Sequence, residues 1–326
     1  MSDSIKHECG VAMLRLLKPL AYYQEKYGSS IYGLNKMYLL MEKQHNRGQD
    51  GVGLANIKLN VDPGKRYISR KRSVATNPIQ DVFKQVNQRF VELEENDPEK
   101  LKDPQWMKEN MPFTGELFLG HLRYGTFSGN TIEQCHPFLR QSNWKTRNLV
   151  LAGNFNMTNV DELFQQLVDL GQHPKRKVDT VTILEKIGHF LDESNDDIYY
   201  KHKDKFSKKE ITKVIEDELD VQDILTQSAK YWDGGYVMCG LMGHGDAFAL
   251  RDPNAIRPAY YYKDDEIVVV ASERSVIQTS FDVNIEDVKE IKAGHALIIK
   301  KDGRVDEKQV KEPLERKSCS FERIYF

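Results

Sequence analysis

The stretch Cys9-Gly10-Val11-Ala12-Met13-Leu14-Arg15-Leu16-Leu17 lies close to the start of a chain of 326 residues. Its run of apolar side chains predicts a β-strand. A cysteine at the start of a strand has a simple structural explanation, because free cysteine is among the most frequently buried residue types. The rest of the sequence decides whether Cys9 is only a core thiol or a reacting group.

The composition is that of an ordinary globular protein, with 40% hydrophobic and 29% charged residues. This length allows one large domain or two ordinary ones. The formal net charge of −2 gives no electrostatic case for binding nucleic acid or an anionic membrane. No apolar run approaches the roughly 20 residues that cross a bilayer. The first residues lack the apolar stretch of a signal peptide, so the expected location is cytoplasmic.

Other stretches with alternating or continuous apolar residues predict further strands. They are Glu116–Arg123, Asn148–Asn154, Gly235–Met242, Ala247–Arg251, Ala259–Tyr262, Ile267–Ser272 and Ala296–Lys300. Helical spacing and end signals predict helices at Leu34–Lys43, Val160–Leu170 and Thr180–Leu191. Polar turns at 263–266 and 301–304 predict hairpins, and therefore antiparallel sheet. Strands in two groups with helices between and around them predict a layered α+β fold.

Two charged segments, 62–113 and 192–218, interrupt these elements. One helix is predicted inside the first, near Ile79–Leu93. Because neither segment offers much apolar surface to bury, both are predicted to be insertions that run over the protein surface.

Polar residues cluster at three points where a helix or strand ends. The glycine-rich loop Gln44–Gly53 either ends a helix or closes over a small ligand, since glycine permits close approach. Arg123 is either a surface or ion-pair residue or the group that captures a carboxylate, since a guanidinium offers paired donors. The run Gly153–Asn159 either caps a helix or supplies an oxyanion hole, made of an Asn amide and an adjacent backbone N–H.

Other motifs favour structural explanations. Gly240–Gly245 lacks the helix and spaced acidic residue of a dinucleotide loop and is interpreted as a turn between strands. Cys135-His136 is interpreted as a core thiol followed by a loop histidine, and Cys239 as a core residue.

Four motifs, in their order along the chain, resemble those of the class II glutamine amidotransferases, which are N-terminal-nucleophile hydrolases. These motifs are Cys9-Gly10-Val11, Arg47-Gly48-Gln49-Asp50, Gly120–Thr126 and Asn154–Asn159. Ala249–Pro258, Val270–Arg274 and Cys319–Phe326 resemble one branch of that family, the amidophosphoribosyltransferases. The resemblance implies a four-layer αββα sandwich of two antiparallel sheets.

The resemblance also implies roles for particular residues. Cys9 matches the nucleophile, which in this family is the first residue of the mature chain and has its own α-amino group as general base. Asn154 and the N–H of Phe155 match the oxyanion donors. The implied glutamine-binding residues are Arg123 and Thr126 for the α-carboxylate, Asp179 for the α-ammonium, and Arg47 and Gly48 in the loop that closes on the substrate.

The sequence departs from the family pattern at three positions. Phe155 stands where the family usually has Gly, and a backbone with positive φ would be strained by this bulky side chain. Asn46 is an insertion in the glutamine loop, and Gly153 replaces a common His. None of these changes removes a reacting group.

By the same resemblance, residues 1–8 are a leader that is removed on maturation. Residues 9–318 form a type 2 glutamine amidotransferase domain, and residues 319–326 begin the link to a phosphoribosyltransferase domain absent from the sequence. While the leader remains attached, the Cys9 nitrogen is an amide and cannot accept a proton, so such a chain is expected to be an inactive precursor.

The expected partners are L-glutamine and the phosphoribosyltransferase domain, with assembly into a homo-oligomer left open. The resemblance implies no cofactor and no metal site in this chain, and Mg²⁺ only with the absent domain. The predicted activity is glutamine hydrolysis through a Cys9 thioester, with the ammonia going to phosphoribosyl pyrophosphate in purine synthesis. The alternatives are a glutaminase domain serving aminosugar or asparagine synthesis, and a catalytically silent regulatory domain.

Overall fold

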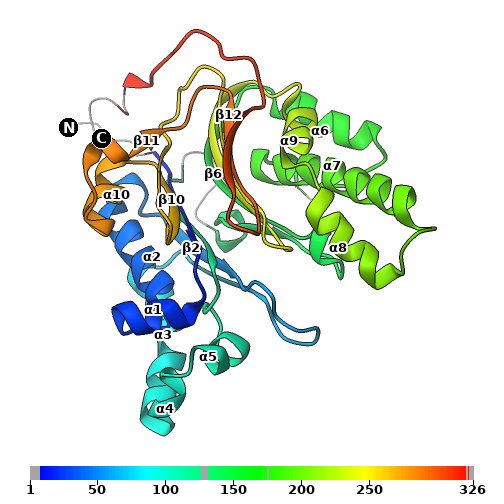
Figure 1. Ribbon diagram of the computed structural model, residues 1–326. Helices are drawn as coiled ribbons and strands as arrows, with labels where there is room; N and C mark the ends of the chain where they lie inside the picture. Colours follow the sequence, from blue (N-terminus) through cyan, green and yellow to red (C-terminus); the bar gives the residue numbers. More distant parts are fainter. Residues whose placement is uncertain (1–7, 126–130, 175, 321, 323–326) are drawn as a thin grey trace.

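Two antiparallel sheets lie face to face in the computed structural model of the chain, and helices cover the outer face of each sheet (Figure 1). The structure describes residues 8–125, 131–174, 176–320 and 322. The expected fold class, a four-layer αββα sandwich of two antiparallel sheets, is confirmed.

The first sheet has seven strands, and the strand that begins beside Cys9 lies in its middle. In spatial order the strands are β11 (Lys289–Glu290), β9 (Tyr260–Lys263), β10 (Ile267–Ala271), β1 (Gly10–Leu16), β4 (Leu117–Arg123), β2 (Gly51–Ile57) and β3 (Ile68–Ser73). Both neighbours of β1, β4 and β10, are antiparallel to it, so its register is fixed from two sides.

The second sheet has six strands. In spatial order they are β13 (Val305–Gln309), β12 (His295–Ile299), β8 (Ala247–Arg251), β7 (Gly234–Met242), β6 (Leu149–Met157) and β5 (Phe138–Arg140). The predicted hairpin turns at 263–266 and 301–304 join β9 to β10 and β12 to β13. Of the predicted turn Gly240–Gly245, the first three residues belong to β7, and the turn that joins β7 to β8 follows Met242.

One helical layer covers each sheet (Figure 1). The layer on the seven-stranded sheet contains α1 (Leu20–Tyr27), α2 (Tyr32–Lys43), α3 (Pro78–Asn96) and α10 (Arg274–Phe281). The layer on the six-stranded sheet contains α6 (Val160–Asp169), α7 (Asp179–His202), α8 (Lys208–Glu218) and α9 (Val221–Ala229). The short elements are α4 (Pro98–Leu101), α5 (Pro104–Asn110), η1 (His45–Arg47), η2 (Ile132–Gln134), η3 (Lys145–Arg147) and η4 (Ile285–Asp287).

Alternation along the central strands divides the core into three clusters. In β1, Val11 and Met13 lie in the cluster between the two sheets, whereas Ala12 and Leu14 lie in the cluster beneath the helices. Successive side chains of a strand point to opposite faces. Because β1 is covered on both faces, every one of its residues is buried, which explains its nearly continuous apolar sequence.

The two charged segments are part of the packed fold, and the expectation that they run over the surface is wrong. Helix α3 buries Ile79, Val82, Phe83 and Val86 at helical spacing against α2 and the seven-stranded sheet. The segment 68–73 forms the edge strand β3. Low average hydrophobicity concealed a strongly one-sided helix, since burial depends on the face and not on the mean.

The second segment shows the same effect. The predicted helix Thr180–Leu191 continues to His202 as α7, and α8 follows. Ile198, Ile211 and Ile215 are buried in the cluster beneath these helices.

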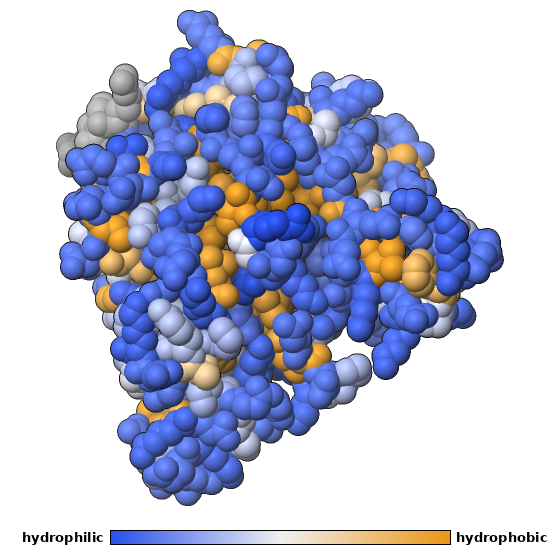
Figure 2. Space-filling view, in the orientation of Figure 1, coloured by the Kyte–Doolittle hydropathy of each residue, from blue (hydrophilic) through white to orange (hydrophobic). Residues whose placement is uncertain are grey.

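The described surface is mostly polar on the face seen in Figure 2, and the largest group of visible apolar side chains lies in a band between the two sheets with their helical layers. No helix in the described ranges combines the length and the apolar character needed to cross a membrane.

The packing of α3 can be tested by a core truncation. Phe83 is 4% exposed, and its ring meets Tyr38 of α2 edge to face at a centroid distance of 5.0 Å. Phe83→Ala should lower the free energy of unfolding by about 3–5 kcal/mol, because the cavity forfeits both transfer and contact energy. Urea denaturation measures this loss. The exposed neighbour Lys84 is the control, and equal small effects of Phe83→Ala and Lys84→Ala would contradict the packing.

Candidate active site

Cys9 lies at the end of the sandwich where β1 begins and β4 ends. The register pairs Gly10 with Leu122, which brings the residue before β1 next to the residues that close β4. The backbone N–H of Tyr124 donates to Cys9 Sγ at 3.3 Å. The predicted nucleophile is thus held by the strand end that carries Arg123.

Strand alternation directs three predicted site residues into the same space. Cys9 precedes Val11 by two residues, and Arg123 follows Leu119 by four; both apolar residues face the other sheet. In β6, Ala152 faces the first sheet, so Asn154 does too. His121 Nε2 lies 3.0 Å from the Gly153 carbonyl oxygen, which shows that the end of β4 and this part of β6 lie at the same end of the sandwich.

The amide of Asn154 is available for a ligand. Asn154 is 4% exposed, and its Nδ2 finds no acceptor within the part of the chain that the structure describes. A buried donor without an acceptor costs about 1–3 kcal/mol. Such a group in a folded protein calls for an explanation, and a substrate oxygen would provide one.

The backbone N–H of Phe155 is directed away from β7. Antiparallel strands alternate bonded and non-bonded pairs. Gly243 N donates to Asn148 O at 2.9 Å, so the even-numbered residues of β6 are those that exchange bonds with β7. The N–H of Phe155 therefore points to the side of β6 where β5 lies. The pairing with β5 does not extend past Leu151, so no strand is paired with β6 at Phe155 on this side among the described residues. This orientation fits the predicted second oxyanion donor.

The concern about strain at Phe155 is not supported. The residue lies inside the extended strand β6, and its φ is not positive. Gly153 has a separate reason to lack a side chain, because a Cβ there would lie 2.5 Å from the Val237 carbonyl oxygen.

The predicted glutamine loop packs directly on the end of β4. A Cβ at Gly48 would lie 2.6 Å from the carbonyl carbon of Arg123, so this approach requires glycine. Asp50 N donates to Arg123 O at 3.0 Å, and Gly125 N donates to Asp50 Oδ2 at 2.8 Å. The loop and Arg123 therefore form one unit. Thr126, predicted to bind the α-carboxylate, lies outside the described residues.

Arg47, predicted to lie in the loop that closes on glutamine, is at the end of the short helix η1 next to Cys9. Its side chain is fully buried, and its Nε donates to the Cys9 carbonyl oxygen at 3.2 Å. Its Nη2 donates to both carboxylate oxygens of Glu322, at 2.7 and 2.8 Å, and Glu273 lies 3.5 Å from Nη1. The guanidinium thus fixes the backbone of the nucleophile.

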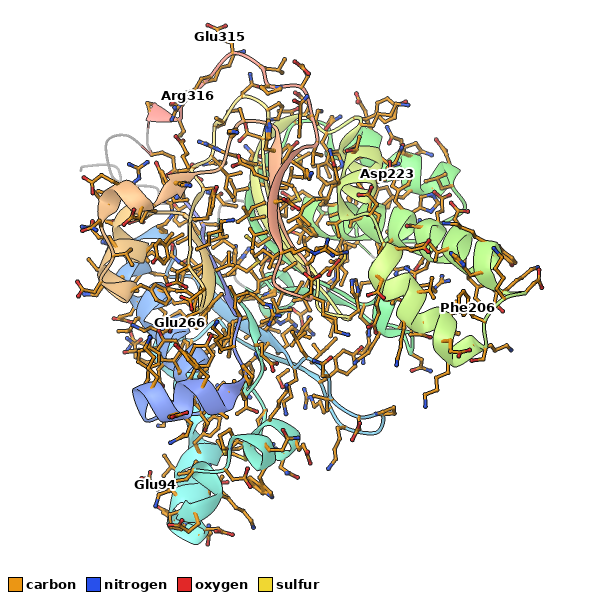
Figure 3. All side chains as sticks on the ribbon, in the orientation of Figure 1. Glu94, Phe206, Asp223, Glu266, Glu315 and Arg316 are labelled. Atoms are coloured by element: carbon orange, nitrogen blue, oxygen red, sulfur yellow. The ribbon has the colours of Figure 1, made fainter. Side chains whose placement is uncertain are left out.

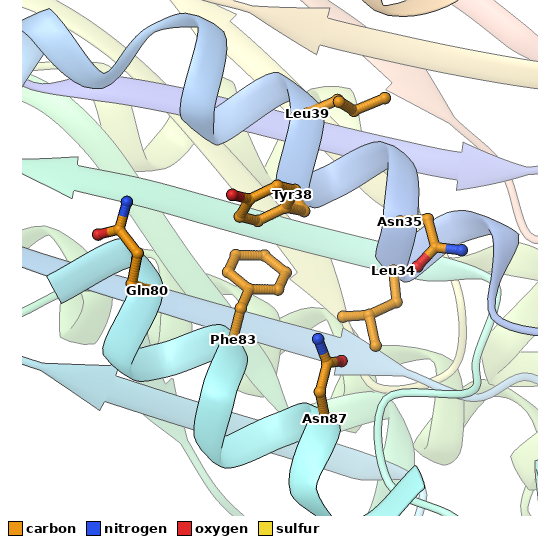
Figure 4. A pocket seen from close by; sticks show the side chains of 7 residues that line it. All are labelled: Leu34, Asn35, Tyr38, Leu39, Gln80, Phe83 and Asn87. Carbon is orange, nitrogen blue, oxygen red and sulfur yellow. The ribbon is translucent and has the colours of Figure 1, made fainter. Parts of the chain in front are cut away.

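The segment that leads to Glu322 crosses this end of the molecule. Figure 3 shows Glu315 and Arg316 on the stretch that passes over the end of the sandwich toward α10. Arg316 Nη2 bonds to Glu290 Oε1 at 3.0 Å. A cavity of ≈ 450 Å³ lies beneath this stretch, and its lining includes Arg47 and Cys319. A second cavity of ≈ 480 Å³ lies between α2 and α3, away from Cys9, and is lined by Leu34, Asn35, Tyr38, Leu39, Gln80, Phe83 and Asn87 (Figure 4).

The thiol of Cys9 is kept neutral in this form of the chain. Burial raises its pKa, the Tyr124 backbone N–H lowers it, the Glu8 carboxylate raises it, and the Arg257 and Arg123 guanidinium groups lower it. Glu8 forms an ion pair with Arg257. The residue directly before the nucleophile is therefore held in place, and its charge opposes formation of the thiolate.

Asp179 is the first residue of α7. It is half-buried, and its pKa is raised by burial, an effect that the N–H of Thr180 opposes. Thr180 N donates to Asp179 Oδ1 at 2.7 Å. Thr180 Oγ1 in turn lies 2.9 Å from His136 Nε2, and His136 Nδ1 accepts the N–H of Gly153. Asp179 is thus connected to the strand that carries Asn154.

Two histidines to which no functional role was assigned from the sequence lie in the site. Cys135 is a buried thiol as predicted, but His136 is only 8% exposed, and its ring stacks on His121 at 4.2 Å. Burial lowers the pKa of His121 to about 3 and that of His136 well below its ordinary value. The pair becomes visible only in the fold, where His121 of β4 approaches His136, two residues before β5. In the described ranges, no group of three or more His, Cys, Asp or Glu side chains is placed to hold a metal ion.

The chain is similar to enzymes named amidophosphoribosyltransferase. The relative from Pasteurella multocida is 28% identical over 288 residues, 87% of this chain and 47% of the relative. That from Haemophilus influenzae is 26% identical over 299 residues, 89% of this chain and 48% of the relative. No protein-family model matches the chain.

Solved structures agree with the fold. A glutamine phosphoribosylpyrophosphate amidotransferase from B. subtilis, complexed with ADP and GMP, matches with a TM-score of 0.59 and 22% identity. The match covers 98% of this chain and 52% of that one. The chain therefore spans about half the length of the relatives that it matches, and homologues of this one name cover most of it.

The buried histidines should make stability depend on pH. Each imidazole is neutral when folded but titrates near pH 6.5 when unfolded, so below that pH the unfolded chain binds more protons and is favoured. Between pH 6 and pH 5, each should cost about 1.4 kcal/mol of unfolding free energy per pH unit. Urea denaturation should show a shallower pH dependence for His121→Gln than for the exposed control His45→Gln. Equal slopes would contradict the buried neutral state.

Proposed function

We propose that the chain is the glutaminase part of an amidophosphoribosyltransferase, which hydrolyses L-glutamine to glutamate and ammonia through a thioester on Cys9. The observation that carries the proposal is that Cys9 Sγ accepts a hydrogen bond at the strand end that carries Arg123, while the Asn154 amide, which has no acceptor among the described residues, lies at the same end of the sandwich. Acyl transfer from glutamine requires a nucleophile, a group that binds the α-carboxylate and a donor to the oxyanion, and these roles fit Cys9, Arg123 and Asn154.

In the first half-reaction, the freed α-amino group of Cys9 takes the thiol proton, and Sγ attacks the side-chain amide carbon of glutamine. The oxygen of that amide becomes negatively charged and is bound by Asn154 Nδ2 and the N–H of Phe155. Collapse of the intermediate breaks the C–N bond as the ammonium of Cys9 returns its proton to the nitrogen. Ammonia leaves, and a glutamyl thioester remains.

In the second half-reaction, water attacks the thioester carbon, and the same donors bind the second oxyanion. The base is again the α-amino group of Cys9. Glutamate and the free thiol result. Throughout, Arg123 binds the α-carboxylate of the substrate through paired donors, and Asp179 binds its α-ammonium.

The transfer of ammonia to its acceptor is assigned to a second domain of the whole enzyme. The relatives are about twice as long as this chain, which supports a fused phosphoribosyltransferase domain that passes the ammonia to phosphoribosyl pyrophosphate. The product would be phosphoribosylamine, with pyrophosphate as the leaving group, a step of purine synthesis.

Replacing the oxyanion donor tests the proposed chemistry. Asn154→Ala, in a chain that starts at Cys9, should lower kcat for glutamine hydrolysis about 10²–10³-fold and change KM little, because the lost bond forms in the transition state. Asn156→Ala is the matched control, since Asn156 is an exposed Asn of the same strand. A variant Asn154→Ala that keeps most of the wild-type turnover would refute the oxyanion assignment.

Leader removal provides a second test. A chain that retains Met1–Glu8 should show no glutaminase activity, because its Cys9 nitrogen is an amide and the Glu8 charge opposes the thiolate. The chain that starts at Cys9 should release glutamate. Intact-mass analysis beside the assay identifies the active species. Full turnover by a sample without any species that starts at Cys9 would contradict the mechanism.

A further inference from the structure

We propose that His136 is a positioning residue that, through Thr180, holds the carboxylate of Asp179 at a fixed place relative to the oxyanion strand β6. The inference rests on the proposed function, in which Asp179 binds the α-ammonium of glutamine. A series of hydrogen bonds runs from Gly153 of β6 through His136 and Thr180 to Asp179.

The direction of the hydrogen bonds follows from the chemistry of each atom. Gly153 N–H is a donor, so His136 Nδ1, 3.3 Å away, must accept and carries no proton. The proton of the neutral ring is therefore on Nε2, which donates to Thr180 Oγ1 at 2.9 Å. The threonine hydroxyl then has its own proton to donate, and Asp179 Oδ1 lies 3.3 Å from it.

Thr180 bonds to a single carboxylate oxygen of Asp179. Both the hydroxyl and the backbone N–H of Thr180 donate to Oδ1, at 3.3 and 2.7 Å. Oδ2 takes no part in these two bonds. These two bonds restrain the position of Oδ1, and the backbone N–H of Asp179 also donates to its carboxylate.

The imidazole that begins this connection is itself immobile. His121 stacks on its face with an interplanar angle of 25°, and Phe138 meets its edge at 5.1 Å. A Cβ at Gly53 would lie 1.8 Å from the His136 carbonyl oxygen, so the backbone of His136 is pressed against β2. His121 Nε2 donates to the carbonyl of Gly153, so the two rings hold both sides of this residue.

The hydrogen bonds from Gly153 to Asp179 matter for the reaction because Asn154, the proposed oxyanion donor, directly follows Gly153. The amide carbon and the α-ammonium of one glutamine molecule are a fixed number of bonds apart. If Asp179 shifts relative to Asn154, the substrate cannot satisfy both at once. Misplacement of a binding group loses the advantage of orientation even when no reacting group is removed.

The experiment uses the chain that starts at Cys9 and compares two substrates. Thr180→Val keeps the side-chain shape and removes the hydroxyl. It should raise KM for L-glutamine about tenfold or more, with kcat changed much less, since a bond to a charged group is weakened. Glutaramate, which is glutamine without its α-amino group, should show an unchanged KM. Thr182→Val is the matched control, because the Thr182 hydroxyl donates to the carbonyl oxygen of Val178, the residue directly before α7, and has no other partner among the described residues.

His136 variants provide the second arm. His136→Gln can accept from Gly153 N–H and donate to Thr180, so it should retain a near wild-type KM for glutamine, whereas His136→Leu should behave as Thr180→Val. Thermal unfolding reports whether each variant is folded, and Thr180→Val decides the matter if His136→Leu is not.

Two results would overturn the inference: a wild-type KM for glutamine in Thr180→Val, or an equal rise in KM for glutaramate. A failure of the proposed function looks different. In that case the wild-type chain starting at Cys9 would neither hydrolyse glutamine nor take a diazo-oxo-norleucine label on Cys9, and the inference would fall with it.

Discussion

The pairing of β1 with β4 is the constraint on which the site depends. Gly10 lies opposite Leu122, and this register places the thiol of Cys9 against the N–H of Tyr124. A slip of one residue would turn Cys9 toward the helices, since side chains alternate between faces. The slip is opposed from both sides, because β10 pairs with the other edge of β1 and each face of β1 is buried in a separate core cluster.

Much of the fold could be predicted from the sequence, because long apolar strands and polar hairpin turns are local signals. Strands β2 and β3 could not. Gly51 and Gly53 made β2 resemble a loop, yet Gly53 is needed where His136 approaches it. In β3, Ser69 and Ser73 are the buried residues and the side chains between them are basic, so no apolar alternation existed to be detected. Both strands are specified by their neighbours.

The site could be predicted as a set of residues but not as an arrangement. The motifs named Cys9, Arg123 and Asn154, which the fold brings to one end of the sandwich. They did not reveal that Arg47 is fully buried and bonded to Glu322, a partner 275 residues away. Nor did they reveal the stacked histidines, which come from separate elements and meet only through tertiary packing.

The central claim is that one bound glutamine molecule contacts the sulfur of Cys9 and the amide of Asn154 while its α-carboxylate and α-ammonium bind to Arg123 and Asp179. A crystal structure of the Cys9-starting chain after treatment with diazo-oxo-norleucine tests it most directly. The account predicts a single covalent bond at Cys9 Sγ, with the ketone oxygen of the adduct facing Asn154 Nδ2, its carboxylate on Arg123 and its ammonium on Asp179. An adduct on another cysteine, or a ketone oxygen turned away from Asn154, would contradict the account.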